Sequence, residues 1–278
     1  MTDSRERQPE DRKPMPGDDR SQVTRVLLPA LILALVLGLW EATVRVRGIP
    51  PYILPGPVLI GRTLVQDAPV LFDSLLTTLR TTIEGFLAAA LGGIGLALLF
   101  NRSKWLEDAF LPYAVILQVT PVIAVAPLLL IYLPQHLAVV ACAWIVAFFP
   151  VLSNTLLGLK SVDRNLMGLF ALHGASRGQT LRYLQLPSAL PHILGGLRIA
   201  GGLSLIGAVV AEIAAGSAGA GSGLAYRIAE SSYRLNIPRM FAALLLLCVA
   251  GIVIYMALSA ASHFMLRRWH ESALKEEA

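Results

Sequence analysis

Three ionisable side chains, Glu84, Arg198 and Glu212, lie inside long apolar stretches of the sequence. A charge in the hydrocarbon of a membrane costs about 2.5–3.5 kcal/mol on insertion scales, so each of them must face protein, water or a partner. Glu84 follows Arg80 by four residues, the spacing of an ion pair on a helix. Arg198 is expected to be structural. Glu212 lies near the end of its stretch, where it either lines an entrance or serves packing.

A second polar group interrupts another apolar stretch and consists of Gln118, Thr120, Pro121 and Pro127. A proline inside a helix removes a backbone hydrogen bond and kinks the helix. Such a broken helix is tolerated in a membrane where it lines a cavity or packs in protein. The pattern therefore fits either a substrate pathway past Gln118, Thr120 and Pro121 or a structural kink.

Asn154 and Ser204 are further candidates for such a pathway. Asn154 follows Pro150 in the next apolar stretch, and interhelical packing bonds are its favoured role. Ser204 belongs to a run of small residues between positions 195 and 208, which lets another helix approach closely. We expect that close contact near the centre of the assembly, with a dimer axis as one place for it.

The chain lacks the side-chain groupings of an enzyme. Its two cysteines, Cys142 and Cys248, both lie in apolar stretches, which predicts neither a disulfide framework nor a metal-ligand cluster. No stretch holds His, Cys and carboxylates at catalytic or metal-binding spacing. The phosphate loop G-x-x-x-x-G-K-[ST] is absent, and the glycine-rich residues 216–223 are interpreted as a flexible outer loop. We therefore expect no enzymatic activity and no cofactor on this chain.

The composition is that of a membrane protein. Of the 278 residues, 55% are hydrophobic and only 15% are charged, against roughly 25% charged in an average soluble domain. A bilayer core about 30 Å thick needs about 20 apolar residues in a helix. Six windows qualify: 26–44, 81–100, 112–133, 137–158, 190–215 and 241–264. The prediction is an all-α polytopic protein with six transmembrane helices. Its net charge of +5 fits anionic lipid better than nucleic acid.

The basic residues predict the orientation. With both termini in the cytoplasm, fifteen Lys and Arg residues fall in inner segments and seven in outer ones, as the positive-inside rule favours. Residues 1–25 are polar and are expected to form a disordered cytoplasmic tail. We expect residues 26–268 to form the membrane domain and residues 269–278 to form a second cytoplasmic tail.

The longest inner connection, residues 159–189, carries the most informative pattern. Four of its residues follow helical spacing: Leu166, Leu169, Phe170 and His173. Gly174 then breaks the pattern, since glycine adopts a positive φ at little cost, and Ser176 is placed to cap a second helix. We expect Pro187 to end that helix. The connection is thus predicted to be a cytoplasmic helical hairpin, and on pattern alone a plain surface feature is its favoured interpretation.

These residues also carry a family resemblance. The run Gly174-Ala175-Ser176-Arg177 followed by Leu186-Pro187 resembles the permease subunits of bacterial ATP-binding-cassette (ABC) importers, the binding-protein-dependent transport inner membrane components. Residues 52–57, 120–128 and 195–200 match as well, and the resemblance covers residues 27–268. Within the family the chain is most similar to the branch that carries nitrate, sulfonates, taurine and thiamine precursors. The third apolar stretch is more like the members that carry thiamine precursors or heterocycles.

The resemblance implies that the hairpin is a coupling element, which seats in a groove of a separate ATPase. The residues it assigns to this contact are Leu169, Phe170, Gly174, Ala175, Ser176, Arg177, Leu186 and Pro187. Family members often carry an acidic residue and two alanines before the glycine, where this chain has Gly168, Leu169 and Phe170. An apolar contact through Leu169 and Phe170 is therefore expected in place of an ion pair.

The resemblance further implies the partners and the mechanism. Two ABC ATPase subunits would bind the ATP, a second permease copy would complete a homodimer, and a periplasmic or lipoprotein binding protein would deliver a small solute. The protein would lie in the bacterial inner membrane among its lipids and work by alternating access. The rival interpretations are a passive channel or a membrane scaffold, neither of which needs ATP.

Overall fold

The computed structural model describes residues 19–216 and 221–267, and it describes residues 19–26 by their backbone alone. The elements are α1 (Asp19–Val46), α2 (Pro57–Gln66), α3 (Ala68–Arg102), α4 (Lys104–Val119), α5 (Val122–Tyr132), α6 (Gln135–Lys160), α7 (Arg164–Leu172), α8 (Arg177–Thr180), the π-helical turn η1 (Leu181–Gln185), α9 (Leu186–Ala215), α10 (Leu224–Tyr233) and α11 (Ile237–Leu266). The described part of the chain contains no strand, which confirms the all-α class.

The predicted tails fall mostly outside the described residues. Residues 1–18 and 268–278 are not described, and α1 already begins at Asp19, within the stretch expected to be a disordered tail. Five helical runs are long and apolar enough to cross a membrane: Leu27–Val46, Ala68–Arg102, Gln135–Lys160, Arg177–Ala215 and Ile237–Leu266. These runs confirm a polytopic membrane protein.

The third expected span, residues 112–133, is not one helix. It consists of α4 and α5, which meet at an angle of 99° across Thr120 and Pro121. Pro121 is extended, with φ −64° and ψ 111°, because a residue without an N–H cannot continue the hydrogen bonds of α4. The sequence predicts a kinked or broken helix here, and the break at Pro121 confirms it.

The core of the bundle is built by α3, α6 and α9, which pack through small residues. A Cβ on Gly207 of α9 would lie 2.6 Å from the carbonyl oxygen of Cys142 on α6, and one on Gly85 of α3 would lie 2.5 Å from Ala143 Cβ. Backbones this close leave no room for a side chain at either glycine. In a membrane, where no hydrophobic effect drives helices together, such close packing supplies the van der Waals contacts that hold them. The small residues of the fifth predicted span, residues 190–215, were expected to allow close approach of another helix. In the structure that helix is α6 of the same chain.

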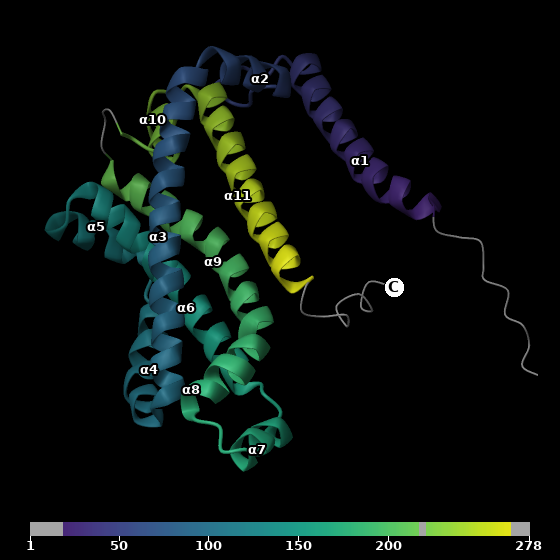
Figure 1. The fold of residues 1–278 in the computed structure, drawn as a ribbon. Coiled ribbons are helices and arrows are strands. Elements are labelled where there is room, and N and C mark those ends of the chain that lie inside the picture. Colours follow the sequence, from purple (N-terminus) through teal and green to yellow (C-terminus); the bar gives the residue numbers. More distant parts are fainter. Residues whose placement is uncertain (1–18, 217–220, 268–278) are drawn as a thin grey trace, which may run out of the picture.

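Figure 1 shows α2 and α10 at one end of the bundle, here called the α10 end, and α7 at the opposite end, the α7 end. In the same view α1 stands apart from the other helices and is joined to them through α2. Its side chains from Leu27 to Leu39 are exposed, whereas Trp40 is half-buried and packs on Phe241 with the ring centroids 5.9 Å apart. α1 therefore contributes little to the core of the single chain.

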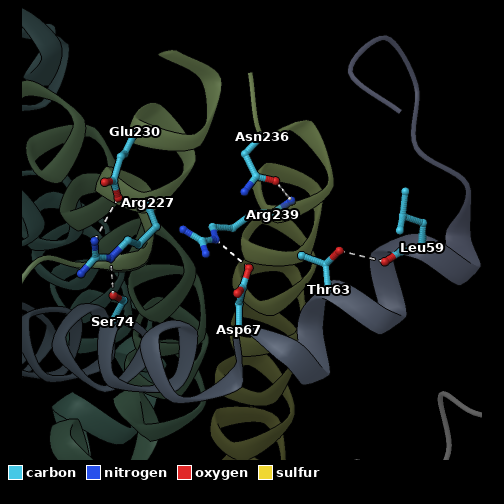
Figure 2. Close-up of polar contacts among 8 residues, drawn as sticks. All are labelled: Leu59, Thr63, Asp67, Ser74, Arg227, Glu230, Asn236 and Arg239. Atoms are coloured by element: carbon cyan, nitrogen blue, oxygen red, sulfur yellow. Dashed lines mark hydrogen bonds and ion pairs between the residues drawn. The ribbon is translucent and has the colours of Figure 1, made fainter. Parts of the chain in front are cut away.

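Polar contacts hold the short helices at the α10 end (Figure 2). Arg239 of α11 donates to Asp67 at the start of α3 over 2.7 Å, and Asn236 caps α11 by accepting from the backbone N–H of Arg239. Arg227 of α10 donates to Ser74 of α3 over 3.1 Å and pairs with Glu230. These contacts fix α10 against α3.

Candidate functional site

The candidate site at the α7 end is an elbow formed by α7, Gly174 and α8. Gly174 has φ +69°, the left-handed conformation that the sequence predicts for it. Its N–H donates to the carbonyl of Ala171, and the N–H of Ala175 donates to that of Phe170, so the turn closes the end of α7. A Cβ on Gly174 would meet nothing within 4 Å, so the backbone conformation alone requires glycine.

Ser176 caps α8, as its type and place predict. Its Oγ accepts from the N–H of Gln179 over 3.3 Å, and the Gln179 side chain accepts from the N–H of Ser176 over 2.7 Å. This reciprocal pair is a capping box, which satisfies two donors that a helix start otherwise leaves free. The end of α7 and the start of α8, on the two sides of Gly174, are therefore both fixed by hydrogen bonds.

The predicted end of the second hairpin helix at Pro187 is wrong. Helix continues from Arg177 to Ala215, and Pro187 lies in the first turn of α9, a position where proline is tolerated. The π-helical turn Leu181–Gln185 precedes it, and the N–H of Leu186 reaches back to the carbonyl of Leu181. That widened turn accommodates the missing proline N–H. Leu186 and Pro187 are half-buried and belong to the root of a membrane helix.

α7 presents apolar side chains to solvent at the end of the molecule. Leu166, Leu169 and Leu172 are 46%, 48% and 86% exposed, whereas Phe170 and Ala175 are half-buried. Asp163 caps this helix by accepting from the N–H of Asn165. Since α7 is a short helix with no fully buried residue, its leucines form an apolar surface without a partner in the described chain. Arg177 is exposed beside this surface.

Two contacts that sequence reasoning missed tie the elbow to the bundle. Asn101, at the end of α3, donates to the side chain of Gln185 in η1 over 2.9 Å. Lys160, the last residue of α6, pairs with Glu107 of α4. The partners lie 84 and 53 residues apart in the chain, so no local spacing signals them. They connect the π-helical turn and the start of the hairpin to the spans.

The pathway candidates at the α4–α5 bend are accessible. Gln118 and Pro121 are exposed and Thr120 is half-buried, and the Thr120 hydroxyl donates to the carbonyl of Ile116 over 2.7 Å. The backbone N–H of Thr120 donates to the same carbonyl over 3.1 Å, so both bonds close the last turn of α4. Pro127 lies within α5. The bend thus exposes the polar side chain of Gln118 in an apolar helix pair.

Asn154 and Ser204 are used for packing. Asn154 donates to the carbonyl of Pro150 over 2.8 Å and lies against Gly196 of α9. Ser204 is fully buried and donates to the carbonyl of Thr82 on α3 over 2.7 Å. None of the contacts described for these two residues joins them to the α4–α5 bend.

Glu212 lies at the α10 end and is almost fully buried. Its Oε2 accepts from the Thr78 hydroxyl over 3.0 Å and from the N–H of Ala225 over 3.1 Å, and Thr78 accepts from the N–H of Leu224 over 2.9 Å. The first two N–H groups of α10 are thereby capped by side chains of α9 and α3. Sequence reasoning missed this network, although the threonine pairs at 77–78 and 81–82 share one face of α3.

The other two ionisable residues of the spans, Glu84 and Arg198, differ in their hydrogen-bond and ion-pair partners. Glu84 pairs with Arg80 over 2.9 Å, as predicted, and also with His136 of α6 over 2.6 Å. Arg198 is half-buried, and its Nε has no hydrogen-bond partner in the described chain. The described residues include no group of three or more His, Cys, Asp or Glu that could hold a metal ion.

Comparison with known proteins gives consistent matches. The family model "Binding-protein-dependent transport system inner membrane component" matches residues 86–272. The riboflavin transport system permease protein RibX of Chloroflexus aurantiacus is 34% identical over 243 residues, 86% of this chain and 89% of that protein. The formylaminopyrimidine transport permease protein ThiX of Halalkalibacterium halodurans is 34% identical over 244 residues, 87% of this chain and 96% of that protein. A crystal structure of an amino acid ABC transporter superposes with a TM-score of 0.58 over 74% of this chain and 96% of that chain, at 21% identity.

Proposed function

The chain belongs to the family of binding-protein-dependent transport system inner membrane components, the permease subunits of ABC importers, and on this basis we propose how ATP drives it and what it carries. It is a multi-pass membrane protein whose relatives are transport permeases and not enzymes. The family implies a separate ATPase and a substrate-binding protein as partners. ATP is accordingly hydrolysed on the partner subunit.

The elbow at the α7 end is the proposed contact with the ATPase. The observation that carries this proposal is the apolar surface of Leu166, Leu169 and Leu172 on a helix whose direction Gly174 and Ser176 fix. An ordered apolar helix face at a water-exposed end fits insertion into a groove of a partner. Gly168 leaves the face without a carboxylate, so the contact is apolar through Leu169 and Phe170, with Ala175 and Arg177 beside it.

Movement of the elbow would reach the spans through continuous helix. α8, η1 and α9 form one helical run from Arg177 to Ala215, which includes Leu186 and Pro187. The bond between Asn101 and Gln185 links the same turn to α3. A displacement of α7 by the ATPase would therefore be transmitted to α9 and α3, two helices of the core, as alternating access requires.

The remaining architecture is part of the proposal and is supported by the family and by the exposed surfaces. The α7 end is cytoplasmic with both chain termini, as the distribution of basic residues favours. Two copies form a homodimer with two ATPases, in the bacterial inner membrane. The translocation path runs between the copies past Gln118, Thr120 and Pro121, because the α4–α5 bend offers exposed polar atoms. Lipid covers the leucine-rich outer faces of the spans.

The proposed solute is a small heterocycle delivered by the binding protein. RibX and ThiX, at 34% identity, are described as carrying riboflavin and formylaminopyrimidine, whereas the taurine permease protein TauC of Escherichia coli is 26% identical. The accessible residues of the bend, Gln118 and Thr120, are neutral hydrogen-bonding groups. Such groups suit a neutral ring with polar edges better than an anion.

Uptake by the reconstituted complex tests the proposal. Proteoliposomes holding the permease and its ATPase, supplied with the binding protein, are expected to accumulate riboflavin or formylaminopyrimidine only with internal ATP. Gly174→Val is expected to reduce this uptake about tenfold, since a β-branched residue in the left-handed region is strained by about 1–2 kcal/mol.

Gly178→Val is the matched control. A Cβ on Gly178 would also meet nothing within 4 Å, but this glycine lies in α8 without a positive φ. We expect it to keep most of the uptake, and we expect both variants to insert into the membrane. Unchanged ATP-driven uptake in Gly174→Val contradicts the coupling role, and solute flux without ATP supports a passive channel instead.

A further inference from the structure

A pocket of about 150 Å³ lies at the α10 end, beside the start of α10. Thr77 and Thr81 of α3, Gln135 and His136 of α6, Glu212 of α9 and Gly223 before α10 line it. Val139 and Gly221 complete the lining, so four separate parts of the chain meet at one cavity that carries both polar and apolar groups. The contacts of Arg227 and Arg239 (Figure 2) hold α10 and α11 to α3 beside this region.

The carboxylate of Glu212 is only half satisfied. Its Oε2 accepts hydrogen bonds from Thr78 and from the N–H of Ala225, but its buried Oε1 has no partner in the described chain. The side chain is 5% exposed and lines the pocket. A buried acceptor without a donor is costly, and a charged one more so, unless a ligand supplies the missing contact.

The hydroxyls that line the pocket are acceptors as well. Thr77 donates its proton to the carbonyl of Asp73, and Thr81 donates to the carbonyls of Thr77 and Thr78. Each hydroxyl therefore keeps its two lone pairs, which can accept hydrogen bonds or bind a cation. Gln135 adds an amide oxygen, and the imidazole of His136 lines the pocket with its Nε2 paired to Glu84. Beside that imidazole, the pocket offers the carboxylate of Glu212 and several neutral oxygens.

The other charges around the pocket are compensated. The carboxylate of Glu84 is paired with Arg80 and with His136, whose Nε2 lies 2.6 Å from it. Arg227 of α10 is paired with Glu230. The unpaired oxygen of Glu212 is thus the local feature that calls for a positive partner, and carboxylate and neutral oxygen ligands suit hard cations. A single carboxylate balances one positive charge, which favours a monovalent cation over a divalent one.

We propose that this pocket binds a small monovalent cation, Na⁺, K⁺ or NH₄⁺, with Glu212 Oε1 as its charged ligand and the neutral oxygens of Thr77, Thr81 and Gln135 around it. The cation neutralises the carboxylate that holds α10. A Cβ on Gly223 would lie 2.1–2.2 Å from the atoms of this carboxylate, so the start of α10 is packed directly on it. Occupancy is therefore expected to stabilise the attachment of α10 to α3 and α9.

Thermal unfolding of the full-length purified chain tests this site. Tm is measured while NaCl, KCl or NH₄Cl replaces choline chloride at constant ionic strength and pH. At least one of the small cations is expected to raise Tm saturably, whereas choline is not. The three salts also identify which cation fits best.

Substitutions at and near the pocket test whether the rise of Tm with cations comes from binding at Glu212. Glu212→Gln keeps an oxygen for Thr78 and Ala225 and places an amide N–H where Oε1 lies, so it is expected to weaken cation binding by at least about tenfold without unfolding the chain. Gln135→Leu, at an exposed position, is expected to weaken it less. Glu84→Gln changes a carboxylate whose oxygens are both paired and is expected to keep the response.

Three results would overturn the site. They are a Tm that rises equally with choline, a full cation response in Glu212→Gln, and a Tm that depends on pH but on none of the cations. The last of these would mean that Glu212 carries a proton instead.

Discussion

Ser176 fixes the direction in which the chain leaves the Gly174 turn, because its hydroxyl and the Gln179 side chain cap α8 reciprocally. Ser176→Ala removes one half of this capping box. Loss of such a cap costs about 1 kcal/mol, so the variant is expected to loosen the elbow and lower ATP-driven uptake several-fold. Uptake by proteoliposomes measures the effect.

Ser188→Ala is the matched control for this substitution. Ser188 is exposed in the first turn of α9, in the same helical run. It is expected to transport like the unchanged chain, and Ser176→Thr, which keeps the hydroxyl, is expected to transport nearly as well. Equal uptake by Ser176→Ala and Ser188→Ala would show that the cap has no part in coupling.

Residues whose partners lie within four positions could be predicted from the sequence. The positive φ of Gly174, the cap at Ser176 and the pair of Arg80 with Glu84 all depend on near neighbours. The partners of Glu212 could not be predicted, since Thr78 lies 134 residues away. Only the packing of α3 against α9 and α10 brings these groups together.

Among the helices, α6 and α9 depend on a close approach at Gly207. A Cβ there would lie 2.6 Å from the Cys142 carbonyl oxygen and 2.8 Å from Ala143 Cα, which are backbone atoms that cannot move alone. Gly207→Ala is therefore expected to destabilise the chain by about 1–3 kcal/mol through overpacking. Thermal unfolding in detergent measures the loss.

Gly202→Ala controls for the change in helix propensity. Gly202 lies in the same helix, is exposed, and has nothing within 4 Å of a Cβ. This variant is expected to be as stable as the unchanged chain or slightly more so, since alanine favours helix. If both variants lost the same stability, the contact between α6 and α9 would not be the cause.

The helices that contain proline were the hardest elements to predict from the sequence. Hydropathy located the apolar residues 112–133 but not the 99° bend between α4 and α5, because proline permits both a kink and a full break. Pro187 was expected to end a helix, yet the preceding π-helical turn lets the helix continue through it. Tertiary packing decides between these outcomes.

In the molecule as a whole, the two ends of the bundle should lie on opposite sides of the membrane. Tyr233, in the last turn of α10, is 89% exposed, and Leu172, at the end of α7, is 86% exposed. A cysteine at position 233 is expected to react with a membrane-impermeant maleimide in intact cells. A cysteine at position 172 is expected to react only after the cells are opened.

Of the native cysteines, Cys142 is buried in α6. Cys248 is exposed on the single chain but lies within the apolar helix α11, where a membrane-impermeant reagent is not expected to reach it. Reaction of position 172 in intact cells would reverse the proposed orientation. The spans themselves were predictable because their length and hydropathy are local properties. Their arrangement around α3, α6 and α9 was not, since it rests on contacts between distant glycines and small side chains.

Docking of the apolar α7 surface on the ATPase can be tested by site-specific photo-crosslinking in the assembled complex. A benzophenone amino acid is placed at Leu172, with Tyr233 on α10 and Leu91 on α3, which is 77% exposed, as controls. We expect a crosslink to the ATPase from position 172 and none from positions 233 and 91. A crosslink to the ATPase from position 233, or none from position 172, would mean that the elbow is not the coupling contact.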